Sequence, residues 1–410
     1  MIFMLPQEFL QQKFREYYSK SEISSIENVH EREFGIGEFG KKISQRHLAF
    51  RTQAEFNSFL KNFSPFFVSY SLAFYQFPER KPMTAKNLLK ADIVYEFDSD
   101  DIKTECKKEH DAWKCDSCGT SGKGSIQNCT NCGSSVKVEQ WVCEECLDAV
   151  KKQVFRLLNF LEKDFGLSEG ISLNFSGNKG FHVHVRNEAF RKISHKARIE
   201  LLDYLTSSQI NPKFLGFETE GKRIIAPKYS EAMGWAKKLL DSLIELFESN
   251  NSERLAVNAN ISAREAEKIL LKKQEIIDDM KKGILLQFFP AFTKSEKFWN
   301  DLMTGIIKEE SLRIDRQTSV DLFKIIRVPE TIHGSTGLVA KTLSASELKK
   351  YNAFNECVAF SNTPIKVHVL NVPKFELKKQ KFGPYNNEII EVPEFAGIFL
   401  LASGKADQII

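Results

Sequence analysis

The 410-residue chain lacks any uninterrupted apolar run that approaches the roughly 20 residues a membrane-spanning helix needs. Its N-terminal stretch turns polar after five residues, so it lacks the apolar region of a secretory signal peptide. Cysteine is nearly absent outside one segment, because seven of the eight cysteines lie between Cys106 and Cys146 and only Cys357 stands apart. There is no internal repeat and no low-complexity tract. We therefore expect a soluble intracellular protein with no membrane association and no disulfide framework.

The chain also has little excess charge of either sign. Its 58 basic and 54 acidic residues give a net charge of +4, so overall charge does not by itself indicate a nucleic-acid-binding protein. Local basic patches can still exist within such a balanced total. The hydrophobic fraction of 42% and the 34 phenylalanines indicate a folded protein. This length allows two or three domains, or one large core with insertions.

Hydrophobic patterning predicts a mixed α+β fold. Residues 5–20 have the pattern of an amphipathic helix, and residues 64–77 are aromatic and β-branched, as in a strand. Residues 147–166 place apolar side chains on one helical face and end at a glycine. Residues 171–185 form two short β-type runs around a glycine-rich turn. These elements predict a β-rich core.

Two segments interrupt this core. The cysteine-rich segment 106–146 has too few apolar residues for a large core of its own. The segment 191–310 is mainly amphipathic, and within it Ser262 and Glu265 match a capping box that precedes an apolar stripe ending at Gly283. We predict a core formed by residues 1–105, 147–190 and 311–410, a zinc-binding insert at 106–146 and an α-helical insertion at 191–310.

The cysteine spacing predicts two zinc sites. Paired cysteines two residues apart, in an intracellular chain, are typical of zinc rather than of disulfides. Seven cysteines and one histidine supply two tetrahedral sets of four ligands. We expect an inner ribbon site nested within an outer site, although interleaved pairings satisfy the same count. The inner ligands would be Cys115, Cys118, Cys129 and Cys132, and the outer ligands Cys106, His110, Cys143 and Cys146.

Four acidic residues crowd the end of the apolar run IVYEFDSDD, residues 93–101. If the strand continued through them, Glu96, Asp98 and Asp100 would share one face, because side chains alternate along a strand. Asp101 would then point to the opposite face. Two converging carboxylates suit Mg²⁺, which prefers one or two carboxylates together with substrate phosphates. The alternative is a solvated exit from a strand, since aspartate favours turns.

Two further blocks carry groups that suit a bound triphosphate. In SGNKGFHVHV, two glycines bracket a short tip where backbone N–H groups, Ser176 and Lys179 can face an anion. An ordinary hairpin turn is the alternative explanation for this block. In RIDRQTSVDLFKIIRVPETIHGSTG, Asp315, Arg327 and His333 supply an acid, a guanidinium and an imidazole. Taken alone, each of these three residues could also be an ordinary polar residue on the protein surface.

Together, the ordered motifs resemble the catalytic (small) subunit of archaeal and eukaryotic DNA primases over nearly the whole chain. The resemblance rests on four blocks in the order found in that family. They are REFGIGEFGKKISQRHLAF (32–50), the strand that ends in FDSD, the SGxxGxHxxV motif that begins at Ser176, and the third-acid block that contains Asp315.

The resemblance implies the archaeo-eukaryotic primase core, with an RRM-like β-sheet and a second β-rich lobe. It implies that Asp98, Asp100 and Asp315 hold two catalytic Mg²⁺ or Mn²⁺ ions, with Asp321 a weaker candidate than Asp315. It also implies DNA-templated primer synthesis by nucleotidyl transfer from nucleoside triphosphates. The implied nucleotide-binding residues are Ser176, Gly177, Lys179, His182, Arg327, His333 and Arg46.

The same resemblance implies three partners: a single-stranded DNA template, nucleoside triphosphates and a separate large subunit that carries an iron–sulfur cluster. Only Cys357 lies outside the zinc segment, so this chain has no second set of four cysteines for such a cluster. The implied location is the cytoplasm of an archaeal cell, or the nucleus of a eukaryotic one. A stand-alone primase-polymerase for repair or bypass synthesis, and a non-catalytic zinc-ribbon paralogue that binds nucleic acid, remain alternatives.

Overall fold

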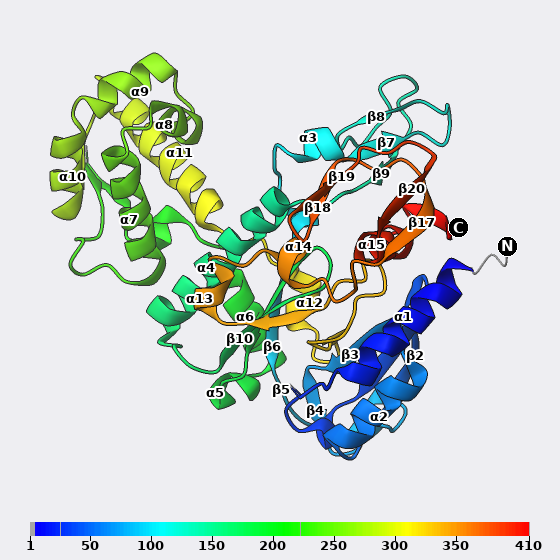
Figure 1. Cartoon of the computed structure of the whole chain (residues 1–410). Coiled ribbons are helices and arrows are strands. Elements are labelled where there is room, and N and C mark those ends of the chain that lie inside the picture. Colours follow the sequence, from blue (N-terminus) through cyan, green and yellow to red (C-terminus); the bar gives the residue numbers. More distant parts are fainter. Residues whose placement is uncertain (1–4, 25, 222, 410) are drawn as a thin grey trace. The chain divides into compact units, whose positions relative to one another are not determined.

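The computed structural model describes residues 5–24, 26–221 and 223–409 and confirms a mixed α+β fold (Figure 1). The chain divides into two compact units. The first unit comprises residues 1–155, 169–195 and 313–410, and the second comprises residues 156–168 and 196–312. Among the described residues, no helix combines the length and the apolar character that crossing a membrane requires.

Two four-stranded antiparallel sheets form the centre of the first unit. The first sheet has the order β15-β3-β1-β2 and the second has the order β16-β10-β11-β6. Their strands are β1 (Phe34–Glu38), β2 (Lys41–Leu48), β3 (Phe67–Ser71), β6 (Ile93–Asp98), β10 (Ile171–Phe175), β11 (Gly180–Val185), β15 (Ile325–Arg327) and β16 (Lys341–Leu343).

Aromatic side chains pack helices α1 (Pro6–Lys20) and α2 (Gln53–Phe63) onto the first sheet. The ring of Phe34 on β1 lies 4.8 Å from that of Phe56 on α2, measured between centroids. Phe14 on α1 lies 5.0 Å from Phe66, just before β3. The abundance of phenylalanine in the sequence thus supplies the core between these helices and the sheet.

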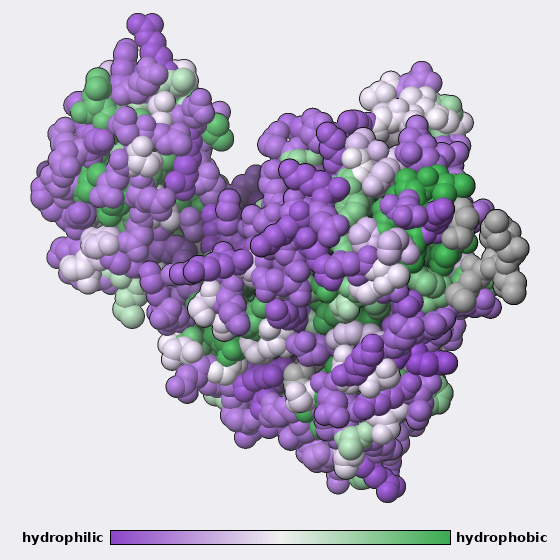
Figure 2. Space-filling view, in the orientation of Figure 1, coloured by the Kyte–Doolittle hydropathy of each residue, from purple (hydrophilic) through white to green (hydrophobic). Residues whose placement is uncertain are grey.

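The remaining elements of the first unit are short. Its other helices are α3 (Lys107–His110), α5 (Glu188–Arg191), α12 (Arg316–Val320), α13 (Ala345–Leu348), α14 (Ala353–Glu356), α15 (Glu394–Ala402) and the 3₁₀ turns η1 (Val29–Glu31), η2 (Met83–Lys86) and η3 (Ser99–Asp101). Its other strands are β4 (Ala73–Tyr75), β5 (Leu88–Ala91), β7 (Ala112–Lys114), β8 (Ser121–Lys123), β9 (Lys137–Glu139), β17 (Pro364–Val369), β18 (Phe375–Leu377), β19 (Gln380–Phe382), β20 (Glu388–Pro393) and β21 (Ala406–Ile409). On the face shown in Figure 2, this unit is mainly hydrophilic, with an apolar area over β17 and β20.

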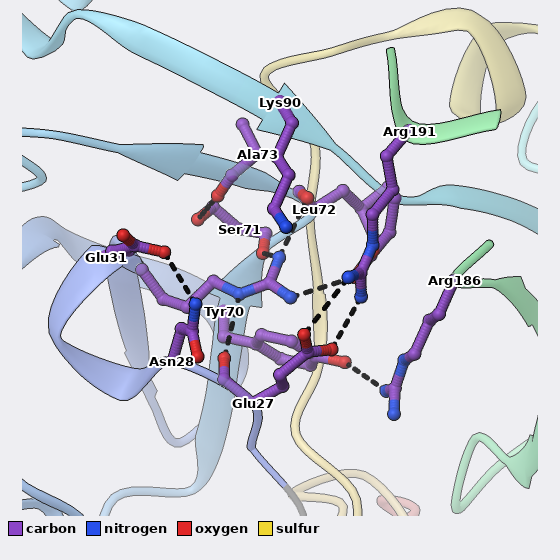
Figure 3. Close-up of polar contacts among 12 residues, drawn as sticks. Glu27, Asn28, Glu31, Tyr70, Ser71, Leu72, Ala73, Lys90, Arg186 and Arg191 are labelled. Atoms are coloured by element: carbon purple, nitrogen blue, oxygen red, sulfur yellow. Dashed lines mark hydrogen bonds and ion pairs between the residues drawn. The ribbon is translucent and has the colours of Figure 1, made fainter. Parts of the chain in front are cut away.

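A buried ion network holds Arg32, the first residue of the REFG block (32–50), in the first unit. Arg32 Nη2 lies 2.8 Å from Asp92 Oδ2, and Arg191 Nε lies 2.7 Å from Asp92 Oδ1. Arg191 also contacts Glu27 at 2.5 Å, and Arg186 donates to the hydroxyl of Tyr70 (Figure 3). Because removing one member would leave a buried charge without its partner, this network is structural and leaves Arg32 unavailable to a ligand.

The second unit is mainly helical but contains a small antiparallel sheet of order β12-β13-β14. Its elements are α6 (His195–Leu205), η4 (Pro212–Leu215), β12 (Glu218–Glu220), β13 (Arg223–Ile225), α7 (Gly234–Glu248), α8 (Ser252–Ala259), α9 (Ala263–Leu270), α10 (Lys273–Lys281), β14 (Ile284–Leu285) and α11 (Phe292–Glu310). It also includes the C-terminal part of α4 (Glu144–Phe165), which the sequence patterning had placed in the core.

The capping box at Ser262 and Glu265 is present, but the helix that follows it is not continuous. The expected apolar stripe is divided between α9 and α10, which are separated at Leu271 and Lys272. The stripe has no apolar side chain at 273 or 274, so one helical turn has nothing to bury. The apolar residues of the stripe are nevertheless buried on both helices, so the stripe is confirmed, but it lies on two helices rather than one.

Candidate functional site

Strand β6 brings the acidic run against the glycine-rich motif. It pairs with β11 so that Asp98 lies opposite Gly180 and Glu96 lies opposite His182. A Cβ atom at Gly180 would lie 1.9 Å from the carbonyl oxygen of Phe97. Only glycine therefore allows the two strands to approach this closely, which places the SGNKG turn beside Asp98.

The structure corrects the expected position of Asp100. Strand β6 ends at Asp98, and residues 99–101 form the 3₁₀ turn η3, so strand alternation does not determine where Asp100 points. Asp100 Oδ2 instead lies 2.7 Å from Lys179 Nζ. The pairing with β11 ends at Gly180, so β6 has no partner strand beyond Asp98.

Asp315 approaches the same strand from a different element. Its backbone N–H donates to the carbonyl of Glu96 at 3.4 Å. Asp315 is the N-cap of α12, and residues 312–314 before it belong to neither a helix nor a strand. Burial favours the protonated acid, but hydrogen bonds from Thr318 and from the backbone N–H of Gln317 outweigh burial and lower the pKa of Asp315. Asp315 therefore stays ionised beside β6.

The pKa values of the acids on β6 are raised rather than lowered. Burial raises the pKa of Asp98, and the charges of Glu96, Asp100 and Asp101 raise it further, against the opposing effect of His182. Burial likewise raises the pKa of Glu96, although Lys324 lies 4.0 Å away. Such a concentration of carboxylates is costly without a cation, and oxygen ligands of this kind suit Mg²⁺ or Mn²⁺. Asp98, Asp100 and Asp315 are not among the groups of described residues whose ligand atoms lie within 4.8 Å of one another.

Cationic and neutral donors lie beside these acids. Arg327 is 9% exposed, its Nη1 donates to the carbonyl of Val68 at 3.3 Å, and its Nε has no hydrogen-bond partner among the described residues. Burial lowers the pKa of Arg327 to about 10, so the group remains charged at neutral pH. A buried guanidinium with spare donors is suited to bind an anion.

Two buried histidines feel the charge of this guanidinium. Burial lowers the pKa of His182 to about 4, so the ring is neutral at pH 7, and its Nδ1 lies 3.1 Å from the Asn174 amide. Burial also holds the pKa of His333 well below its usual range, with the charge of Arg327 adding to the effect. Neutral rings can donate a hydrogen bond without adding charge that would need compensation.

The SGNKG turn packs against the turn that carries His333. The hydroxyl oxygen of Ser176 accepts from the backbone N–H groups of Asn178 and Gly180, both at 3.3 Å. Gly177 adopts a φ of +83°, and a Cβ atom there would lie 2.8 Å from the Cβ of His333. Ser176 and Gly177 therefore set the shape of the turn.

Arg46 is placed differently from the other expected nucleotide-binding residues. Its Nε lies 2.9 Å from the buried carboxylate of Glu33, and its Nη2 donates to the carbonyl of Phe323. The patterning also missed Lys324, whose Nζ donates to the Thr318 hydroxyl at 2.9 Å and faces Glu96. Its position just before an apolar strand in the Asp315 block was the signal that could have identified it.

Two Cys/His clusters have the geometry of tetrahedral metal sites. The ligand atoms of each cluster lie within 4.8 Å of one another, in the same two groups that the nested pairing predicted. Sulfur separations include 3.4 Å for Cys106–Cys146 and 3.5 Å for Cys118–Cys129. A tetrahedron of sulfurs around zinc has edges of about 3.8 Å, given Zn–S bonds of about 2.3 Å. Both clusters can therefore hold zinc.

The inner cluster lies on a small sheet of order β8-β7-β9. Trp113, Cys115 and Cys129 form a small buried core there, with partly buried Ile126, Val136 and Val138 packed against it. The outer cluster is connected differently, because Cys106 follows η3 in the chain and Cys146 lies in the first turn of α4. The outer cluster is therefore the one that adjoins the acidic strand.

A cavity of about 570 Å³ lies apart from these acids, beside Cys143. Its wall includes Trp141, Phe375 and Phe399, whose ring centroids lie 5.6 to 5.8 Å apart. Its described lining includes none of the carboxylates or nucleotide-binding residues considered above. The cavity is therefore not part of the region around Asp98 and Asp315.

Comparison with known proteins is consistent with this arrangement. A family model described as DNA primase small subunit matches residues 137–345 of the chain. The chain belongs to the DNA primase small subunit family. The range matched by the DNA primase small subunit model includes the SGNKG turn, Asp315, Arg327 and His333, whereas Asp98 and Asp100 precede it.

Individual DNA primase small subunits match over a longer range. The chain is 28% identical to the DNA primase small subunit PriS of Methanothrix thermoacetophila, covering 97% of this chain and 98% of that protein. It is 26% identical to PriS of Methanosarcina barkeri, with 97% and 96% covered. It is 27% identical to PriS of Nitrosopumilus maritimus, with 97% and 98% covered. The similarity to these DNA primase small subunits thus extends along nearly the whole chain.

Proposed function

We propose that this chain is the catalytic subunit that synthesises primers on single-stranded DNA. In each step the 3′-oxygen of the growing strand attacks the α-phosphorus of a nucleoside triphosphate, and the bond to pyrophosphate breaks. The observation that carries the proposal is that Asp98 ends strand β6 while Asp315 donates its backbone N–H to the same strand, beside turns that carry Lys179 and His333. We also propose that the two central sheets correspond to the RRM-like sheet and the second lobe of the primase core.

Asp98, Asp100 and Asp315 would hold the two Mg²⁺ or Mn²⁺ ions. When bound, such ions lower the pKa of the attacking hydroxyl and neutralise charge on the phosphates. Asp315 suits this role because its hydrogen bonds keep it ionised. Asp98 suits it because a nearby cation would offset the cost of burying its charge.

The triphosphate would lie against the donors opposite these acids. Arg327 would give charge-assisted hydrogen bonds to phosphate oxygens, and His182 and His333 would donate as neutral rings. Lys179 would leave Asp100 for the phosphates when a metal ion takes its place. Such preorganised charge is the main protein contribution to phosphoryl transfer. Ser176 and Gly177 hold the turn that carries Lys179. Arg46 on β2 would supply a further cationic group for the nucleotide.

The partners follow from the same proposal. We infer a heterodimer with a large primase subunit that carries an iron–sulfur cluster, and a template held mainly through its phosphates. Binding to single-stranded DNA would then be largely independent of sequence and would weaken as salt rises.

The direct test is labelled-nucleotide incorporation on single-stranded DNA with Mg²⁺ or Mn²⁺, with and without the large subunit. We expect short products that require the template and the divalent ion. Extension of a supplied primer without any new initiation, even with the large subunit present, would instead support a primase-polymerase. No incorporation under any of these conditions would overturn the proposal.

Replacing Arg327 by Met separates the effect of this residue on nucleotide binding from its effect on stability. We expect the KM for nucleotide to rise about 100-fold, because charge-assisted hydrogen bonds contribute about 1.5–3 kcal/mol each. The melting temperature should not fall, because the substitution removes a buried cation whose Nε has no partner in the part of the chain that the structure describes. Steady-state kinetics and a thermal melt measure the two effects. Arg186→Met is the matched control, since that guanidinium donates to Tyr70, and an equal rise in KM there would contradict the assignment.

A further inference from the structure

Lys107, which is next to an outer-cluster ligand, forms hydrogen bonds with the turn that carries Asp100. Lys107 directly follows Cys106, and its Nζ donates to the carbonyl of Ser99 at 2.5 Å and to that of Ile102 at 2.9 Å. These two carbonyls lie at the start of η3 and just after its end. One ammonium therefore ties both ends of the turn to the residue next to the outer-cluster ligand Cys106.

A second contact reaches Asp100 from the other side of the insert. The Gln140 side-chain oxygen accepts from Lys179 Nζ at 3.1 Å, and the same ammonium lies 2.7 Å from Asp100. Trp141, the next residue, donates its backbone N–H to Asp111 Oδ1 at 3.0 Å. That oxygen also lies 2.8 Å from Nδ1 of the outer-cluster ligand His110. Gln140 is thus anchored, through its neighbour, to the same outer cluster.

The turn needs such contacts for a physical reason. Asp100 lies in the three-residue 3₁₀ turn η3, next to the carboxylate of Asp101 and two residues after that of Asp98. Mutual repulsion favours opening the turn, and so short a turn has little hydrogen bonding to resist it. We propose that Lys107 and Gln140 are positioning residues that couple the outer Cys/His cluster to Asp100. This inference rests on the proposed function, in which Asp100 is a ligand of the catalytic ions.

The first test measures Mn²⁺ binding to the full chain without nucleotide, by electron paramagnetic resonance. We expect Lys107→Met to weaken binding about tenfold, as loss of an outer-shell contact typically does, while zinc content stays unchanged. Lys107→Arg should restore most of the affinity, because it keeps a cation at that place. Lys108→Met is the matched control, since Lys108 shares the helix but faces Glu105 at 2.5 Å, and it should match the wild type.

Two double-mutant comparisons test whether the effects act through Asp100. Lys107→Met should cause no further loss of Mn²⁺ affinity in an Asp100→Asn background. Gln140→Leu should weaken Mn²⁺ binding, because Lys179, and through it Asp100, would lose its contact with the insert. This effect should disappear in a Lys179→Met background.

Equal Mn²⁺ affinity for Lys107→Met and Lys108→Met would overturn the inference, as would loss of zinc from Lys107→Met. Full additivity in both double-mutant comparisons would also overturn it. A wild-type chain that binds no Mn²⁺ and incorporates no nucleotide would reject the proposed function instead. The two failures are therefore distinguishable.

Discussion

Asp98→Asn is expected to lower nucleotide incorporation by about 1,000-fold or more while raising the melting temperature. The loss follows because a metal-ion contribution of several kcal/mol to the transition state corresponds to a factor of that size. The gain in stability follows because a neutral amide replaces a buried carboxylate crowded by Glu96 and Asp100. Primer-extension assays and thermal melts of the same preparations measure both effects.

The stability gain should depend on pH in a defined direction. The folded chain raises the pKa of Asp98 above its ordinary value of 3.8, so folding favours the protonated acid. The carboxyl of the wild type therefore becomes increasingly unfavourable as the pH rises from 3.8 through the folded pKa. The advantage of Asp98→Asn should be greatest at neutral pH and should shrink as the pH falls below the folded pKa of Asp98.

Asp101→Asn is the control for this prediction. It neutralises a carboxyl of η3, three residues after Asp98, that has no assigned role as a metal ligand. We expect its incorporation rate to stay within about threefold of wild type, since nearby surface charges contribute modestly. Full activity of Asp98→Asn would refute the choice of Asp98 and Asp100 as the convergent pair. An Asp101→Asn variant that is as inactive as Asp98→Asn would also refute it.

Loss of the outer zinc should have the second-largest effect. Cys146→Ser is expected to reduce the zinc content from about two ions per chain to one and to lower incorporation at least 100-fold. The reason is that the outer cluster adjoins both Lys107, which holds η3, and the start of α4. Metal analysis by mass spectrometry and the incorporation assay check the two effects together.

Cys129→Ser is the matched comparison, because Cys129 is also a buried ligand but belongs to the inner cluster. It should lose the other zinc ion while keeping incorporation within about fivefold of wild type. Among the described residues, the inner ligands have no hydrogen bond or ion pair with Asp98, Asp100 or Asp315. Equal losses of activity in the two variants would contradict a special role for the outer cluster.

Local spacing allowed part of the site to be predicted. Paired cysteines determine which thiols can share an ion, because each CxxC turn brings its own two sulfurs together. The strand–turn–strand at 171–185 was also predicted correctly, since glycines at 177 and 180 are needed where the chain turns and where β11 meets β6. Both patterns depend on neighbours only a few residues apart.

The end of a strand could not be predicted in this way. Nothing in the letters DSDD shows that β6 stops at Asp98, because the stop depends on β11 starting at Gly180. Asp315 likewise follows two alternating apolar residues that suggest a strand, but no neighbouring strand pairs with them and the chain turns into α12. Whether an extended segment becomes a strand depends on a partner that is remote in sequence.

The sequence by itself therefore determined the ligand types, the cysteine pairs, the glycine-rich turn and the family resemblance. Only the tertiary structure decided which cysteine pairs share a cluster, that Asp100 lies in a turn and that Lys107 binds this turn. It also decided that Arg46 pairs with Glu33 and that Arg327 is buried with no partner for its Nε among the described residues. The physical reason is that charge and hydrogen-bonding partners are set by burial and by contacts between distant segments. Residue spacing along the chain does not encode these directly.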